Sequence, residues 1–289
     1  FLVDYTTGTL ENTLKFSHEN EDLFLGVSAE AYETMKTNYN DKYAYIFPRV
    51  NLEKNLVYDE RLGILDLRTS YKILKYDTNK TENFLVNDFD WSSRDINRNN
   101  GLKNRILGHI RNINYDTKNV DLYKSDTTNE LYGALGYLTE INLQKNSQGA
   151  LHLLKPKMLI RYSPGEMRKQ KSGDRLNPIN AFRIDRLNNT NNFETGLSGT
   201  VGFEYKIKND GKDLDFSVAQ IINQKENKKM APKTSLDEKL SDLVGSAKYQ
   251  INNKINLKYD FSLDQNYNNF NYNEIGTEID LNPLKIDFS

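Results

Sequence analysis

The most constraining feature of this chain is a strict alternation of side chains from Leu197 to Lys208. Apolar or small residues occupy every second position, and polar or charged residues lie between them. A period of two is the pattern of a β-strand with one apolar and one wet face. The run is as long as the roughly 9–11 residues that cross a bilayer at a tilt, and longer than the usual globular strand. It therefore predicts a strand of a membrane barrel.

Comparable runs recur along the whole chain and predict an all-β fold. We expect an antiparallel transmembrane β-barrel fragment of about fourteen strands, an open curved sheet rather than a closed barrel. The strands are expected at residues 1–5, 10–18, 23–32, 42–54, 64–75, 84–91, 102–113, 131–143, 151–162, 197–208, 214–222, 243–251, 255–263 and 270–281.

Two local features stand out against this pattern. Pro48 lacks the N–H that a central ladder needs, so it should sit at a bulge or a strand end. The one candidate helix covers residues 235–245, with Ser235 as N-cap and Glu238 completing a capping box. Leu243 must soon start a strand, which weighs against that helix.

The connectors between the expected strands alternate in length. Short ones include 19–21, 59–62, 97–101, 146–149, 209–211, 252–254 and 282–283, whereas those at 116–129, 163–192 and 223–241 are long. Outer-membrane barrels have short periplasmic turns and long external loops, so the alternation also assigns an orientation. Aromatic residues near the strand ends fit interfacial girdles.

Composition narrows the possible function classes. A hydrophobic content of 37% and a mean hydropathy of -0.75 suit a barrel, which exposes only every second side chain to lipid. The net charge of -1, from 39 basic and 40 acidic residues, argues against a nucleic-acid partner. The absence of cysteine excludes disulfides and thiolate metal sites within the chain. The start at Phe1 and the alternating run at 284–289 suggest that residues 1–289 are an internal part of one barrel domain.

No residue pattern predicts catalysis or a cofactor. His18, His109 and His152 are scattered without metal-ligand spacing, and we expect them to be exposed or luminal strand residues. A lipid hydrolase would need a serine with a histidine base and an orienting acid, and no such motif is present. Gly199 and Gly202 are interpreted as strand glycines because no helix start follows them. The chain is not expected to be an enzyme.

Five segments between residues 154 and 208 carry a specific resemblance. In order they are Lys155-Pro156-Lys157, Arg161-Tyr162-Ser163-Pro164, Asn180-Ala181-Phe182-Arg183-Ile184-Asp185-Arg186, Phe193-Glu194-Thr195-Gly196 and Gly202-Phe203-Glu204-Tyr205. This order resembles the middle of the C-terminal barrel of the LptD (OstA/Imp) lipopolysaccharide-assembly family of the Gram-negative cell outer membrane. One departure is the Asn-rich run 188–192, which stands where the family has a glycine.

The resemblance implies a function and partners. The family forms an outer-membrane translocon that inserts lipopolysaccharide into the outer leaflet, receiving it from an LptA-like periplasmic bridge. An LptE-like lipoprotein plugs the lumen in relatives, and outer-membrane lipid surrounds the barrel. The alternatives are a general diffusion porin or another large barrel transporter, and a soluble β-sandwich or solenoid adhesin. The implied signature residues of strand and loop are Pro156, Arg161, Tyr162, Pro164, Phe182, Asp185, Arg186, Glu194, Gly196, Gly202 and Tyr205.

The long connector 163–192 generates two expectations. We expect it to fold inward, held by Phe182 and by Arg183 or Arg186 paired with an acid such as Asp185 or Glu194, because an arginine removed from water needs a carboxylate or carbonyl partner. Its basic run Arg168, Lys169 and Lys171 could contact lipid A phosphates, or could be a solvated external loop.

The strand at 255–263 generates an expectation of sidedness. Leu257, Tyr259 and Phe261 should face lipid, and Asn256, Lys258 and Asp260 should face the lumen.

Overall fold

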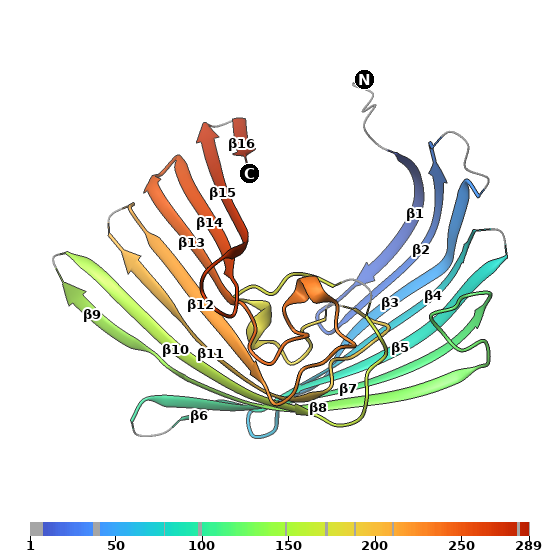
Figure 1. Ribbon diagram of the computed structural model, residues 1–289, viewed down its shortest axis with the longest axis horizontal. Coiled ribbons are helices and arrows are strands. Elements are labelled where there is room, and N and C mark those ends of the chain that lie inside the picture. Colours follow the sequence, from blue (N-terminus) through green and yellow to red (C-terminus); the bar gives the residue numbers. More distant parts are fainter. Residues whose placement is uncertain are drawn as a thin grey trace. The chain divides into compact units, whose positions relative to one another are not determined.

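A computed structural model of the 289-residue chain confirms the all-β prediction (Figure 1). It describes residues 8–36, 41–77, 79–97, 100–147, 149–170, 173–187, 189–209, 211–281 and 284–288. Within these residues the structure has one antiparallel sheet of sixteen strands, in the order β1-β2-β3-β4-β5-β7-β8-β10-β11-β12-β13-β14-β15-β16, with β6 paired to β7 and β9 paired to β10. The order ends at β1 and β16, so the sheet is open, as expected.

The chain divides into two compact units. The first comprises Phe1–Ser92 and His109–Gly133, and the second comprises Ser93–Gly108 and Ala134–Ser289. Strands of the first unit are β1 (Thr9–Glu19), β2 (Leu23–Thr34), β3 (Tyr43–Asp59), β4 (Gly63–Tyr76) and β5 (Lys80–Ser92). Strands β7 (Leu102–Lys118) and β8 (Thr128–Ile141) each contribute one half to each unit. The expected strand at 1–5 lies outside the described residues.

The second unit contains the remaining elements. They are β6 (Ile96–Asn97), β9 (Leu143–Ser147), β10 (Ala150–Ser163), β11 (Gly196–Lys208), β12 (Leu214–Asn223), β13 (Leu243–Asn252), β14 (Ile255–Leu263), β15 (Phe270–Leu281), β16 (Leu284–Phe288) and the short 3-10 turns η1 (Asn180–Phe182) and η2 (Pro232–Thr234). Two long loops of this unit, 164–195 and 224–242, are called the inner loops below.

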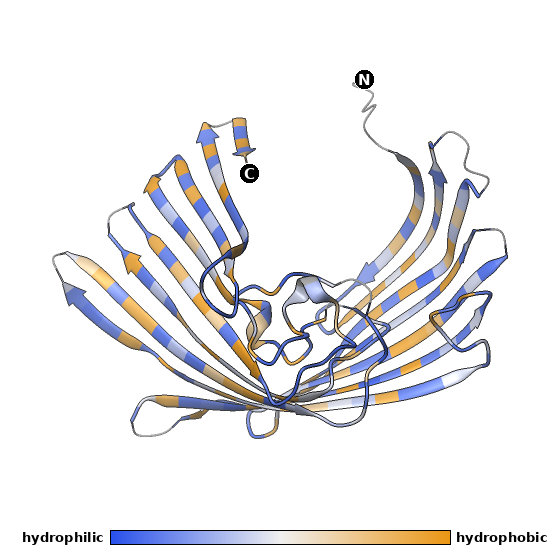
Figure 2. Ribbon diagram, in the orientation of Figure 1, coloured by the Kyte–Doolittle hydropathy of each residue, from blue (hydrophilic) through white to orange (hydrophobic). Residues whose placement is uncertain are grey.

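Alternating hydropathy runs along the strands (Figure 2). In the second unit one face carries the inner loops: Thr200 Oγ1 donates to the Ala181 carbonyl at 3.0 Å. We call this the loop face. The opposite, outer face exposes large apolar side chains, among them Leu135 at 63% and Ile275 at 69% exposure. A water-soluble domain buries such side chains, so their outward direction is the arrangement of a lipid-facing wall.

The register of the second unit confirms the predicted sidedness of β14. Thr200 pairs with Ile221 on β12, Ala219 with Val244 on β13, and Val244 with Ser262 on β14. Because side chains alternate between faces, Ser262 and every second residue before it share the loop face. These residues are Asp260, Lys258 and Asn256. The side chains of Phe261, Tyr259 and Leu257 lie on the outer face.

Prolines interrupt two ladders because they lack an N–H donor. Pro48 lies in β3 where the register to β4 shifts between Ile46 and Arg49, so its predicted place at a bulge is confirmed. Pro156 pairs with Phe203 of β11 without a shift. On the other side of β10, the ladder to β8 ends at Lys157 and the ladder to β9 begins at Leu154. The missing donor at Pro156 explains why β8 and β9 are separate strands.

The candidate helix at 235–245 is wrong. Ser235 has a left-handed backbone with φ of 54°, whereas an N-cap residue takes an extended conformation. Leu240 forms a bridge with Ile222, and β13 begins at Leu243. Pairing with β12 therefore overrides the local helix signal.

The alternation of connector lengths is present in part, since the β14–β15 connector at 264–269 is shorter than the β5–β7 connector at 93–101 on the short side. The turns at 20–22, 60–62 and 253–254 are short, and the inner loops occupy the long side. The β4–β5 connector at 77–79 lies on the long side although it is short. The orientation that the alternation assigns stays a prediction.

A charge on the outer face should destabilise the sheet in a bilayer. We expect Tyr259→Lys to lower the free energy of unfolding by about 2–4 kcal/mol if the site lies near the bilayer midplane. Ser246→Lys is the control, since it places the same charge on the loop face opposite Asp260, and should change stability by about 1 kcal/mol or less. Urea unfolding in lipid vesicles measures both, and equal effects would contradict the assignment of faces.

Candidate functional site

The inner loops of the second unit are packed around a small apolar core. Both loops and the loop face of β12 and β13 contribute to it. Phe182, the last residue of η1, is half-buried against this core, and Lys157 Nζ lies 5.0 Å from its ring centroid. The core residues are Met167, Leu176, Ala181, Leu187, Ala219, Ile221, Met230, Leu236 and Val244. The loops are thus packed structures held on the wall.

Arg161, near the end of β10, anchors the first inner loop at two points. Its Nε donates to the Ile184 carbonyl and its Nη2 to the Glu194 carbonyl, both at 2.6 Å. The guanidinium lies over the Phe193 ring, 5.2 Å from the centroid, and the side chain is fully buried. Asp185 adds a favourable electrostatic interaction. One side chain of the wall therefore fixes both ends of the segment 184–194.

Arg186 and Glu194 form the second anchor. Arg186 Nε donates to one Glu194 carboxylate oxygen at 2.8 Å, its Nη2 contacts the other oxygen, and Nη2 also donates to Ser198 Oγ of β11 at 2.9 Å. Burial would raise the pKa of the Glu194 carboxyl, but the charges of Arg186 and Arg161 outweigh it, and that pKa lies below its ordinary value. The buried pair is therefore ionised.

These contacts confirm the prediction that the connector folds inward. Of the two arginines proposed to hold it, Arg186 is the one that pairs with an acid. Arg186 pairs with Glu194, and Phe182 is not mostly exposed. Arg183 is exposed and forms no ion pair within the part of the chain that the structure describes. The sequence did not decide which of the two arginines pairs with an acid, and the packing of the loop does.

The other signature residues take separate places. Tyr162 and Pro164 are exposed. Gly196 begins β11 with φ of 118°, a conformation that favours glycine. A Cβ at Gly202 would lie 2.2 Å from the Val218 carbonyl oxygen, so only glycine fits this pairing. Tyr205 contacts His152 Nδ1 at 2.7 Å through its hydroxyl.

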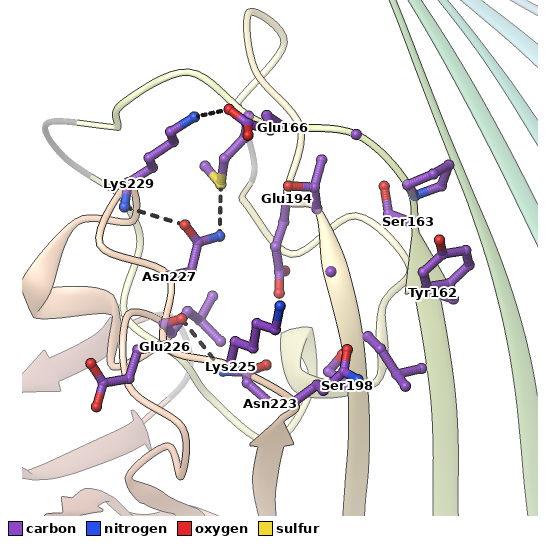
Figure 3. Close-up of a pocket in the computed structure, with 18 of the residues that line it drawn as sticks. Tyr162, Ser163, Glu166, Glu194, Ser198, Asn223, Lys225, Glu226, Asn227 and Lys229 are labelled. Atoms are coloured by element: carbon purple, nitrogen blue, oxygen red, sulfur yellow. Dashed lines mark hydrogen bonds and ion pairs between the residues drawn. The ribbon is translucent and has the colours of Figure 1, made fainter.

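A cavity of about 750 Å³ opens where β10 ends, β11 begins and β12 ends (Figure 3). We call it the rim cavity. The inner loops supply most of its walls, and Lys229 Nζ pairs with Glu166 at 2.7 Å on one side. The contact with Lys229 lowers the pKa of the Glu166 carboxyl. Further lining residues include Ser163, Thr195, Ser198, Asn223, Gln224, Lys225, Asn227 and Lys228.

The predicted basic run does not line this cavity. The Arg168 backbone exchanges hydrogen bonds with the Asn192 side chain, Lys169 is exposed, and Lys171 lies outside the described residues. Phosphate contact by these residues stays a prediction. Three lysines that sequence reasoning missed line the cavity instead: Lys225, Lys228 and Lys229. The sequence feature that could have indicated these lysines is the run QKENKK at 224–229, just after a predicted strand.

The first unit holds a partly buried charge network that sequence reasoning also missed. Arg111 on β7 forms hydrogen bonds of 2.6 and 2.8 Å with Asp88 on β5, and His109 Nδ1 lies 2.7 Å from Asp90. Arg68 on β4 completes it with an ion pair to Asp90 at 2.6 Å. The sequence contains a signal for this network: Asp88 and Asp90 are two residues apart on β5, and His109 and Arg111 are two residues apart on the adjacent β7. No group of three acidic, His or Cys side chains among the described residues could hold a metal ion.

Comparison with known families identifies the chain. Residues 3–285 match the family described as LptD, LPS transport system D. The chain belongs to the LptD family. The match extends the sequence resemblance from residues 154–208 to nearly the whole chain, and the role of the family is in lipopolysaccharide transport. A comparison with curated proteins gave no match. Among the described residues, no helix has the length and apolar character needed to cross a membrane.

Breaking the Arg186–Glu194 pair should loosen the inner loops. We expect Arg186→Met to lower the free energy of unfolding by about 3–5 kcal/mol, because it leaves a buried carboxylate without its guanidinium. Glu166→Gln, which removes an exposed ion pair, is the control and should cost less than about 1 kcal/mol. In a double-mutant cycle Arg186→Met with Glu194→Leu should cost less than the sum of the single changes. Additive losses would contradict a coupled pair.

The same pair predicts an acid-sensitive loop. The pKa of Glu194 is lower in the folded chain than in the unfolded chain. Its stabilisation is therefore present above the unfolded pKa and is lost as pH falls through the folded pKa. Pepsin cleavage within 164–195 should rise on acidification below about pH 4. Across the acidic range in which pepsin is active, and relative to an unfolded reference substrate, Glu194→Gln should be cleaved readily without this step; a retained step would assign it to another group.

Proposed function

We propose that this chain is part of an outer-membrane translocon that assembles lipopolysaccharide into the outer leaflet of a Gram-negative outer membrane. Family membership over residues 3–285 is the observation that carries the proposal. The exposed apolar outer face of the second unit supports the membrane location, because such a face needs lipid around it.

The two faces of the wall suit an amphipathic cargo. Lipopolysaccharide joins a polar, phosphorylated saccharide to acyl chains, and each part needs a different environment. The loop face of β10–β15 offers ion-paired side chains, such as Lys157 with Glu204 at 2.5 Å and Lys248 with Glu278 at 3.1 Å. The outer face offers apolar contact with acyl chains and outer-membrane lipid. A wall with these properties supports transfer of the sugar on one side and of the acyl chains on the other.

The partners follow from the family and are part of the proposal. They are lipopolysaccharide itself, an LptA-like periplasmic bridge that delivers it, and an LptE-like lipoprotein within the lumen. The inner loops fill space beside β10–β13, where such a plug would meet the loop face. Because the inner loops occupy space on the loop face of the sheet, they also argue against a wide pore for solutes.

Depletion of the full-length protein that carries this chain tests the proposal. Pulse-labelled lipopolysaccharide should fail to reach the cell surface and should accumulate on the inner side of the outer membrane. Uptake of small hydrophilic solutes should not fall. Normal surface lipopolysaccharide together with reduced solute uptake would overturn the proposal in favour of a porin.

A further inference from the structure

The rim cavity of the second unit holds cationic groups that the inner loops do not use. Of the carboxylates in its lining, Glu194 is bound by Arg186 and Glu166 by Lys229. Lys225 and Lys228 form no ion pair within the described residues. Figure 3 shows the Lys225 side chain reaching into the cavity. The lining therefore includes two lysines, Lys225 and Lys228, that hold no carboxylate of the described residues, while the Glu226 side chain points away from Lys225 in Figure 3.

The remaining walls suit a sugar. The hydroxyl side chain of Thr195 and the amide side chain of Gln224 also line the cavity. Exposed apolar surface comes from Pro164, which can pack against the face of a sugar ring. A volume of about 750 Å³ is within the range of small-molecule sites.

Two glycines in the lining leave open space beside the backbone. Gly165 and Gly196 have φ of +88° and +118°, and a Cβ at either position would meet no atom within 4 Å. The backbone there is bent by turns and presents no side chain to an entering group. The cavity therefore has ammonium groups in its lining and open space beside its backbone that a ligand can enter.

We infer that the rim cavity binds a phosphate carried on a sugar, with Lys225 and Lys228 as the phosphate ligands. Ammonium groups form strong charge-assisted hydrogen bonds with phosphate oxygens. This inference rests on the proposed function, which supplies such a group in the phosphorylated saccharide of lipopolysaccharide. It adds a docking point at the end of β10–β12 where the long loops lie, and it assigns phosphate recognition to the β12–β13 loop.

Photo-crosslinking in the full-length protein in cells tests this inference. A p-benzoylphenylalanine at Gln224, whose side chain is exposed in the lining, should form an adduct with lipopolysaccharide. Lys225→Gln with Lys228→Gln should reduce the adduct by about tenfold, because two charge-assisted contacts are lost. Lys212→Gln with Lys254→Gln, two exposed lysines in the short turns, is the matched control and should stay within about twofold. A crosslinker at Lys239, exposed in the same loop outside the lining, should give no adduct.

Purified protein distinguishes the sources of phosphate. The Gln224 crosslinker should react with lipopolysaccharide but not with the same lipopolysaccharide after removal of its phosphates by hydrofluoric acid. Inorganic phosphate at equal concentration should not compete; full competition would identify a free-phosphate site and overturn the inference. An undiminished adduct in the Lys225→Gln, Lys228→Gln variant would also overturn it. No adduct at Gln224 while lipopolysaccharide still reaches the surface would overturn the inference and leave the proposed function intact.

Discussion

The architecture depends on the hydrogen bonds of the antiparallel ladder. A strand in a bilayer has no water to satisfy its backbone, so each N–H and C=O must bond to a neighbouring strand. Continuous pairing from β1 to β16 meets this requirement inside the sheet, and the alternation of side chains then assigns one face to lipid and one to the loops. The two prolines show the constraint at work, because the ladder shifts at Pro48 and is interrupted at Pro156.

The inner loops depend on a second kind of interaction. Arg161 and Arg186 are buried, and each finds oxygen partners on the segment 184–194 or on β11. An apolar core around Ala181 and Leu187 then excludes water from these contacts. Polar anchoring and apolar packing thus reinforce one another, and the loops keep a defined shape that supports a cavity at their edge.

The rim cavity and the signature residues have different roles. Arg161, Phe182, Arg186 and Glu194 hold the loops, whereas Lys225 and Lys228 line the rim cavity. The residues of a family motif can therefore hold the loops that form a site, while other residues contact the bound molecule. This distinction explains why the sequence resemblance pointed to the first inner loop, while the unpaired lysines belong to the second.

Side-chain periodicity determined the fold class and the sidedness of β14, and the missing N–H of proline determined the bulge at Pro48, since strand geometry couples each of them to the local sequence. It also showed that the connector 163–192 has apolar residues to bury. Only the tertiary structure decided that Arg186 rather than Arg183 meets Glu194, that residues 235–245 avoid a helix, and that Asp88, Asp90, His109 and Arg111 form one network. These outcomes depend on contacts between residues far apart in the chain, and no local pattern encodes which partner will be within reach.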